Sequence, residues 1–395
     1  MDAETFAWLL TDEGQQLLVH ATHAWADHEG DPVRSAAAVR RTEPNADRAA
    51  AALTQVQLRA KAVAKFGADA TRMYFTPDAL EQATRTRVAA HRAARLATAI
   101  PGGSVIDLGC GIGGDLIAFA RAGLVAAGVD LDPVRAEIAR ANLAALGLPG
   151  AVMATDATAV DTSGFDAAFA DPARRSGRGR VFDADGWTPP WPWVEELLAR
   201  RAVVKVAPGI PHDLVPEGVE AEWVSEGGEV KEAALWSSSL ATVSRRATVL
   251  GGTGLASITD EDDPFVGRDR PVRDLGAFLY EPDGAVIRAG LVTAVAAGVE
   301  GGLVDPHIAY ITSDASFHTP FARSYRVLEQ LPYREKQLKA ALRERAIGRL
   351  TIKKRGVDVV PDELRKRLAL HGDNEATLVL TRVDGSGTAL LVQPF

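Results

Sequence analysis

The stretch Val105-Ile106-Asp107-Leu108-Gly109-Cys110-Gly111-Ile112-Gly113-Gly114-Asp115 decides the fold, because an apolar run ends there in a glycine-rich turn. Glycines are needed where a chain turns sharply out of a strand and a ligand lies against its backbone. Read as Gly109-x-Gly111-x-x-Gly114, with Asp130 twenty-one residues after Gly109, the stretch also fits a dinucleotide fingerprint. The sequence therefore predicts a nucleotide-type ligand at this turn.

Asp107 separates the candidate ligands. A carboxylate just before the turn would repel the pyrophosphate of NAD or FAD. S-adenosylmethionine has no phosphate and presents an ammonium and a sulfonium, so an acid is favourable beside it. The pattern Asp107-x-Gly109-x-Gly111-x-Gly113 therefore favours S-adenosylmethionine. A nicotinamide or flavin cofactor, and a relic site that binds nothing, remain the alternatives.

Two further acids follow the next two predicted strands. Asp130 ends a strand predicted over 125–130, where its two oxygens can accept both ribose hydroxyls of the donor. Asp156 follows a strand predicted over 151–154 and can accept from the adenine amino group. We interpret the three successive strand ends as one donor site. Its expected members are Asp107, Gly109, Cys110, Gly111, Gly113, Asp130, Leu131, Asp156 and Ala157.

Outward from this turn, short apolar runs alternate with helical patterns between about residues 101 and 250. The alternation is typical of a doubly wound, Rossmann-like α/β sheet. Residues 1–70 are rich in Ala, Leu, Gln and Arg and predict a helical N-terminal region. A linker rich in Gly, Asp and Pro is expected at 251–271. Beyond it we expect an α+β portion that closes with a hairpin turned by Asp384-Gly385.

Over about 70–250 the chain resembles the class I S-adenosylmethionine-dependent methyltransferases, through the glycine turn and the acids that follow it. The resemblance implies a methyltransferase domain over 71–250. Such enzymes often have a helix before the first strand that closes over the methionine end of the donor. Tyr74-Phe75-Thr76-Pro77 occupies that place, so we expect Phe75 and Thr76 to contact the donor. The alternative is a plain helix cap, with Thr76 as N-cap and Pro77 in the first turn.

The fourth predicted strand ends in Phe169-Ala170-Asp171-Pro172-Ala173-Arg174. Amino-group methyltransferases place Asp or Asn, two prolines and an aromatic residue here. The exocyclic amine of a base has a delocalised lone pair, so it attacks poorly until a carboxylate and a backbone carbonyl hold its hydrogens. Arg174 stands where the aromatic residue would be, and an arginine plane can stack on a base or contact phosphate. We expect Asp171, Pro172 and Arg174 to be catalytic; the alternative for Asp171 is a strand-end cap.

Three tryptophans, Trp187, Trp191 and Trp193, follow within seven residues, and prolines stiffen the loop between them. A stiff aromatic loop suits the stacking of a flipped or unpaired base. The rings could equally cover the edge of the sheet. We expect these three side chains to contact the substrate, and the alternative is that they cover the edge of the sheet.

The C-terminal part is basic, although the chain carries a net charge of −8. Residues 321–370 hold fourteen Lys and Arg against six Asp and Glu, a local sum of +8. The run Lys353-Lys354-Arg355 could contact phosphates, which would make binding salt-dependent. Arginine is common throughout the chain, so a solvated helix face is the alternative.

Together with Arg288-Ala289-Gly290 and Phe317-His318-Thr319-Pro320, this basic run resembles the THUMP-like C-terminal domain of a family of bacterial class I methyltransferases. The resemblance implies a ferredoxin-like segment at 265–316 and a THUMP-like domain at 317–395. THUMP domains bind structured RNA, so it also implies an RNA partner for Lys353, Lys354 and Arg355. Asp171-Pro172 further resembles the guanine-N2 branch of these enzymes.

The expected function is thus methylation of a base amino group in RNA by S-adenosylmethionine. The alternatives are a small-molecule or protein methyltransferase, and a non-catalytic RNA-binding protein with a vestigial donor site.

Composition sets the outer limits. A chain of 395 residues suggests two or three domains, and 47% hydrophobic with 24% charged residues excludes wholesale disorder. The single cysteine, Cys110, excludes an internal disulfide framework. No apolar stretch approaches roughly 18 residues and no signal-peptide pattern is present, so we expect a cytoplasmic protein without a membrane partner. The histidines lack metal-ligand spacing, so no metal is expected, and the oligomeric state is left open.

Overall fold

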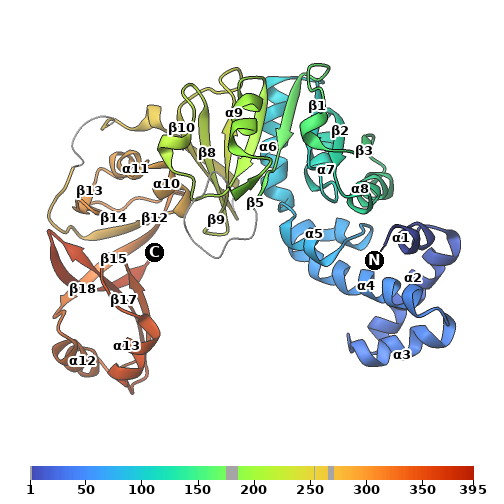
Figure 1. Ribbon diagram of the computed structural model, residues 1–395. Helices are drawn as coiled ribbons and strands as arrows, with labels where there is room; N and C mark the ends of the chain where they lie inside the picture. Colours follow the sequence, from blue (N-terminus) through green and yellow to red (C-terminus); the bar gives the residue numbers. More distant parts are fainter. Residues whose placement is uncertain (1, 175–185, 253, 266–270) are drawn as a thin grey trace. The chain divides into compact units, whose positions relative to one another are not determined.

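The computed structural model describes residues 2–174, 186–252, 254–265 and 271–395 (Figure 1). The chain forms two units, one of residues 1–206 with 235–240 and the other of residues 207–234 with 241–395. Each unit is described by itself.

The first unit begins with helices whose starts are set by capping side chains. Asp2, Thr11, Asp31 and Asn45 each accept a hydrogen bond from an N–H group of the following first turn. Helices α1, α2 and α3 all pack against the long helix α4. The helical segments are α1 (Ala3–Leu9), α2 (Asp12–Asp27), α3 (Pro32–Thr42), α4 (Ala46–Phe66), η1 (Gly67–Thr71), α5 (Pro77–Gln82) and α6 (Thr86–Ala99).

A parallel sheet follows, with strand order β7-β4-β1-β2-β3. Its strands are β1 (Ser104–Leu108), β2 (Val125–Asp130), β3 (Ala151–Ala154), β4 (Ala167–Ala170) and β7 (Ala202–Val206). The connections contain α7 (Gly114–Arg121), α8 (Pro133–Leu146), η2 (Ala157–Ala159), β5 (Ala173–Arg174), β6 (Trp187–Thr188) and α9 (Trp191–Leu198). Because β2 and β4 lie on opposite sides of β1, the chain reverses direction across the sheet there, where α/β folds bind ligands. The predicted Rossmann-like fold is confirmed.

The second unit opens with η4 (His212–Leu214) and with β8 (Glu220–Glu226), β9 (Glu229–Trp236), β10 (Arg245–Gly251) and β11 (Gly254–Thr259). The last two residues of β9 belong to the first unit. β10 runs parallel to β8 and antiparallel to β11. The linker expected at 251–271 is therefore partly wrong, because β11 and η5 (Asp260–Asp262) lie inside it.

A mixed sheet of seven strands forms the rest of the second unit, in the order β13-β14-β12-β15-β18-β17-β16. These strands are β12 (Phe278–Pro282), β13 (Gly302–Asp305), β14 (Ile308–Ser313), β15 (Ala322–Leu331), β16 (Ile347–Lys354), β17 (Asn374–Val383) and β18 (Ser386–Pro394). The helices are α10 (Gly284–Ala289), α11 (Val292–Gly298), α12 (Glu335–Glu344) and α13 (Pro361–Leu368). Because β12 pairs with β15, the predicted boundary at 316–317 falls between neighbouring strands of one sheet.

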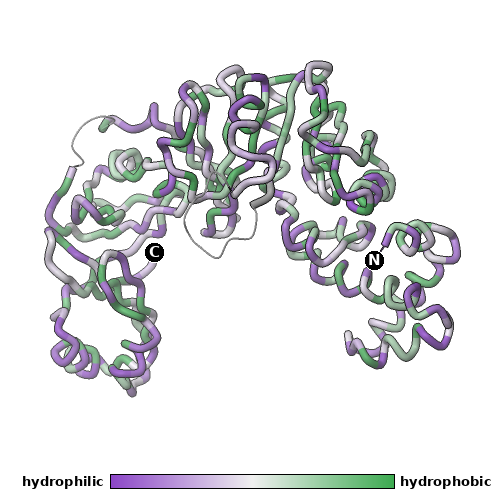
Figure 2. Tube along the Cα trace, in the orientation of Figure 1, coloured by the Kyte–Doolittle hydropathy of each residue, from purple (hydrophilic) through white to green (hydrophobic). Residues whose placement is uncertain are grey.

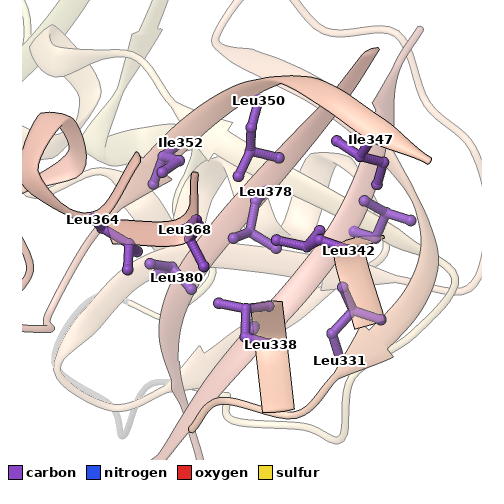
Figure 3. Close-up of a cluster of buried hydrophobic side chains, with 12 residues drawn as sticks. Leu331, Leu338, Leu342, Ile347, Leu350, Ile352, Leu364, Leu368, Leu378 and Leu380 are labelled. Atoms are coloured by element: carbon purple, nitrogen blue, oxygen red, sulfur yellow. The ribbon is translucent and has the colours of Figure 1, made fainter. Parts of the chain in front are cut away.

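Helices α12 and α13 close the core of the C-terminal sheet. Leu338 and Leu342 of α12, with Leu364 and Leu368 of α13, are buried in a cluster with residues of β16, β17 and β18 (Figure 3). Most other residues of both helices are hydrophilic, as the purple colour of this region indicates (Figure 2). The predicted hairpin is confirmed: Val383 pairs with Ser386, and Asp384-Gly385 turns the chain with positive φ at both residues.

Among the helices that the structure describes, none is both long enough and apolar enough to cross a bilayer.

Candidate functional site

The glycine turn between β1 and α7 has a backbone that only glycine adopts easily. Gly109, Gly111 and Gly113 have φ angles of 98°, 56° and 85°. A Cβ atom on Gly109 or Gly111 would meet no atom of the described residues within 4 Å, apart from its chain neighbours, so the turn borders open space. The N–H groups of Gly109 and Cys110 donate to the carbonyl of Val129 at 2.9 and 2.8 Å, which fixes the turn to the end of β2. A ligand can therefore lie directly against this backbone.

Asp107, in β1, is a buried carboxylate with 1% exposure. Within the described parts of the chain, neither of its oxygens has a hydrogen-bond partner. Burial raises its pKa well above the usual value, the carboxylates of Asp115 and Asp171 raise it further, and Arg92 opposes them. An unpaired buried anion is costly unless a cation meets it. Asp107 therefore suits a positively charged ligand group, and its contact with the donor stays a prediction.

Asp130, at the end of β2, faces the same turn. Its Oδ2 accepts the N–H of Gly111 at 2.8 Å, and its Oδ1 accepts the N–H of Asp132 at 2.9 Å. Each carboxylate oxygen has two lone pairs, so both can also accept a ribose hydroxyl. Leu131 follows with 75% exposure and adds an apolar surface. The end of β2 thus offers what a nucleoside needs.

Asp156, after β3, is exposed and begins η2. Its Oδ1 accepts from the N–H and the hydroxyl of Thr158 at 2.9 and 2.8 Å, and these bonds lower its pKa. Ala157 lines a cavity of about 310 Å³ that Leu108 and Trp193 also line. The contact of Asp156 with adenine stays a prediction.

These features fit S-adenosylmethionine as the ligand. The unpaired carboxylate of Asp107 suits the donor's positive charge, and the open glycine backbone leaves room for the methionine portion. Asp130 and Leu131 suit the ribose and the adenine. A pyrophosphate at the same turn would instead approach a buried anion and be repelled.

The segment before α5 is packed into the core. Phe75 is fully buried, its ring lies 5.6 Å from that of Phe66, and its N–H donates to Oε1 of Gln55 at 2.9 Å. Thr76 accepts the N–H of Ala79 at 3.3 Å as the N-cap of α5. This corrects the expectation for Phe75, because a ring with no exposed surface cannot contact the donor. Thr76 is half-buried and stays a predicted contact.

Asp171, at the carboxyl end of β4, is held by residues that the sequence analysis did not identify. The ammonium of Lys205, in β7, donates to Oδ2 of Asp171 at 2.5 Å and to the hydroxyl of Thr84 at 3.3 Å. The Thr84 hydroxyl donates to Oδ2 of Asp115 at 3.0 Å, and Asp115 forms an ion pair with the buried Arg92. A polar chain therefore connects the first turn of α7 with Asp171.

The sequence did contain a signal for Lys205. Strand β7 reads Ala202-Val203-Val204-Lys205-Val206, so one charge interrupts a strand whose other residues are buried. A buried lysine is costly unless it is paired, which makes an exception of this kind worth following. Thr84, Asp115 and Arg92 do not interrupt an apolar strand in this way, so the sequence gives no comparable signal for them.

Ala173 and Arg174 form one strand of a short two-stranded sheet. Pro172 is half-buried, and the backbone of Arg174 pairs with Trp187 between β5 and β6. Trp187 and Trp191 are 3% and 6% exposed, and their rings pack edge to face at 5.7 Å. This corrects the expected stacking role of these two, because buried rings offer no face to a base. Trp193 is half-buried and stays a predicted substrate contact.

The basic run at the end of β16 is partly engaged by other residues of the second unit. Lys353 donates to Oε2 of Glu281 at 2.6 Å, and the guanidinium of Arg355 lies 5.4 Å from the ring centre of Tyr310. Lys354 is exposed. Four other basic side chains of residues 321–370 form ion pairs: Arg345 with Glu329, Arg349 with Glu375, Arg365 with Asp362, and Arg367 with Glu335. The local sum of +8 already includes Glu329, Glu335 and Asp362, so of these partners only Glu281 and Glu375, which lie outside residues 321–370, lower the positive charge of the segment further.

Cys110 is a buried thiol, and burial raises its pKa, so it is not a reactive thiolate. In the described ranges, no group of three or more His, Cys, Asp or Glu side chains could hold a metal ion.

Three family models match separate parts of the chain. They are a domain of unknown function (DUF8688) at residues 2–62, a methyltransferase domain at 81–196 and a THUMP domain-like model at 322–394.

Curated relatives and a solved structure match most of the chain. Uncharacterised S-adenosylmethionine-dependent methyltransferases of Mycobacterium tuberculosis strains H37Rv and CDC 1551 are each 40% identical over 357 residues, covering 87% of this chain and 95% of their own. A crystal structure from Porphyromonas gingivalis W83, assigned as a methyltransferase, has a TM-score of 0.75 and 23% identity. It covers 96% of this chain and 98% of its own, which shows the shared fold.

Proposed function

Because this chain belongs to the S-adenosylmethionine-dependent methyltransferases, we propose that it methylates the amino group of a base in RNA, with the guanine N2 as acceptor. The observation that carries the proposal is the place of Asp171. Leu108 of β1 pairs with Ala170 of β4, so the glycine turn and Asp171 leave adjacent parallel strands at the same edge of the sheet. This shared edge supports Asp171 as the carboxylate that holds the acceptor next to the donor.

The residues of this chain divide the work of methyl transfer. S-adenosylmethionine supplies a methyl group on a positively charged sulfur, and its transfer to an amine leaves a neutral thioether and one proton to be lost from nitrogen. Asp107 balances the donor's charge, and Asp130 holds the ribose. Asp171 accepts an N–H of the acceptor amine, so the amine is oriented before it attacks. Its carboxylate can also receive the proton that the nitrogen loses.

The case for RNA rests on the C-terminal part of the chain. The THUMP domain-like match at 322–394 covers β15 to β18, α12 and α13. Basic side chains on this part are exposed, and those of Arg334, Lys336, Lys354 and Lys366 are the ones we expect to contact phosphates. Such contacts release counterions, so binding should weaken steeply as salt rises.

Total RNA from a strain that lacks the gene provides the test. The protein is incubated with this RNA and methyl-labelled S-adenosylmethionine, and the RNA is digested to nucleosides. We expect label in N2-methylguanosine. RNA without label, under conditions in which the protein binds the donor, would contradict the proposal.

A small-molecule or protein acceptor is the second candidate. The observation that favours it is the pairing of basic side chains with nearby acids, which leaves fewer of them available to a polyanion. The paired residues are Lys353, Arg345, Arg349, Arg365 and Arg367. A protein that ignores bulk RNA at low salt would support this candidate.

A further inference from the structure

Asp171 and Lys205 together present three polar atoms in succession on the acceptor side. They are Oδ1 and Oδ2 of Asp171 and Nζ of Lys205, and the last two atoms lie 2.5 Å apart. The Asp171 side chain is 34% exposed and that of Lys205 is 16% exposed, so a ligand can approach the pair from the side of Asp171. In hydrogen-bonding terms the order is acceptor, acceptor, donor.

We propose that Lys205 is a specificity-determining residue that selects guanine by donating to its O6, while Asp171 accepts N1–H and N2–H. The inference rests on the proposed methylation of a base amino group and assigns the choice of base to named side chains.

The three bases that carry an amino group differ in the order of donors and acceptors along the edge that holds it. Guanine presents the N2–H donor, the N1–H donor and the O6 acceptor in succession, which complements the array fully. Adenine presents one amino donor followed by one acceptor, and cytosine presents an amino donor followed by two acceptors. Either base would therefore satisfy at most two atoms of the array, and its ring-nitrogen acceptor would face Oδ2 of Asp171, where guanine places N1–H. Two facing acceptors repel each other, and a site built to accept an N–H rejects a base that lacks it, which gives the selection.

The surroundings of Lys205 hold the ammonium in place. Its bond to Asp171 is short, and its bond to Thr84 is the longer one, at 3.3 Å. Behind Thr84 lies the ion pair of Asp115 with Arg92, whose guanidinium is itself buried over the ring of Phe169 at 4.5 Å. The incoming O6 can share or replace the longer bond while the shorter one keeps Asp171 oriented.

The experiment compares Lys205→Met with Lys61→Met, a matched control on the exposed surface of α4. Each variant is assayed on total RNA from the gene-deletion strain, and its donor affinity is measured by calorimetry. Loss of a hydrogen bond from a charged group should lower the rate of N2-methylguanosine formation on the order of 100-fold for Lys205→Met. Its donor affinity and the activity of Lys61→Met should stay at the wild-type level.

A second readout separates contact with O6 from a structural role. A synthetic RNA around the site mapped with the wild-type protein is made with guanosine or with 6-thioguanosine, whose sulfur is a weaker acceptor. We expect the wild type to be slowed on the order of 10-fold by the sulfur. Lys205→Met should methylate both RNAs at the same rate. If that variant does not fold, Lys205→Arg keeps the ion pair with Asp171 and is tested in the same way, with a reduced sulfur effect expected.

Three kinds of result would overturn the inference, and each refutes a different part of it. Label in N6-methyladenosine or N4-methylcytidine leaves RNA amino methylation standing but refutes the selection of guanine. N2-methylguanosine formed equally by the wild type and Lys205→Met, or a sulfur effect of equal size in both, refutes the role of Lys205. Absence of any label in RNA refutes the proposed function itself, and the inference with it.

Discussion

Asp107 lies in β1 and Asp171 directly follows the neighbouring parallel strand β4, yet their surroundings are opposite. Asp107 is buried without a hydrogen-bond partner among the described residues, whereas Asp171 is partly exposed and paired with Lys205 at 2.5 Å. An anion kept without a partner costs stability and is ready for a cationic ligand. An anion held by a lysine keeps one orientation and suits a neutral acceptor. The donor side is therefore suited to attract a ligand by charge, and the acceptor side is suited to orient a neutral ligand.

Asp171→Ala should break the acceptor side with the largest effect. Without the carboxylate, the amine is neither oriented nor able to pass its proton on, so kcat should fall about 1000-fold. Donor affinity, measured by calorimetry, should stay near the wild-type value because Asp171 does not bind the donor. Equal losses of turnover and donor affinity would show that Asp171 is structural.

Asp107→Asn should break the donor side. Loss of the buried countercharge should cost roughly 3 kcal/mol of donor binding, or more than 100-fold in Kd. The same change removes an unpaired anion, so the donor-free variant should be more stable than the wild type by about 1 kcal/mol or more. Calorimetry and thermal melting measure the two effects, and a variant that loses stability while keeping its affinity would refute the comparison.

The pH dependence of donor binding should show whether the donor binds through the charge of Asp107. The pKa of Asp107 is raised in the folded protein, so this group favours the fold below its unfolded pKa and loses that contribution as pH rises through the folded value. A bound cation lowers the pKa again. Donor affinity should therefore fall about 10-fold for each pH unit below the pKa that Asp107 has in the donor-free protein.

Melting temperatures with and without donor, measured across pH, check this. The gain from the donor should grow as pH rises. Asp107→Asn is the control, and a wild-type profile that matches the flat profile of this variant would exclude Asp107 as the titrating group.

Thr84→Val should have the smallest effect. It removes the 3.3 Å bond to Lys205 and the bond to Asp115 but leaves the ion pair of Lys205 with Asp171. Both bonds join the hydroxyl to a charged group, and each contributes about 1.5 kcal/mol or more to stability. Because the ion pair of Lys205 with Asp171 stays, only about 1 kcal/mol should be lost from the transition state, so kcat should fall about 5-fold. Steady-state kinetics measure this, and a loss as large as that of Asp171→Ala would show that the chain through Thr84, rather than the ion pair, orients Asp171.

Local patterns explain why much of the donor side could be predicted. The glycine turn and Asp107 lie within seven residues, and the backbone angles of the turn follow from the absence of side chains. The hairpin at Asp384-Gly385 follows from the same kind of rule. Phe75 was misjudged because its position before α5 says nothing about Phe66 and Gln55, which bury it.

The contacts on the acceptor side could not be predicted from local sequence patterns. Lys205 is 34 residues from Asp171 and 121 residues from Thr84, and Lys353 is 72 residues from Glu281. A strand's composition shows that a charge is unusual but does not show which charge meets it. The sequence around Trp187 and Trp191 also predicts a stiff aromatic loop that could stack on a base. Only their burial in the folded chain shows that the two rings are packed in the core instead.

The amino-acid order alone determined the parallel α/β domain, the ligand turn and the sign of the charge that the turn accepts. These depend on backbone freedom and on side chains a few residues apart, which any conformation of the segment keeps close. Tertiary structure decided which acids are left unpaired, which cations are already neutralised and which rings are exposed. Those properties depend on solvent exclusion and on contacts between distant segments, and neither exists until the strands are packed side by side.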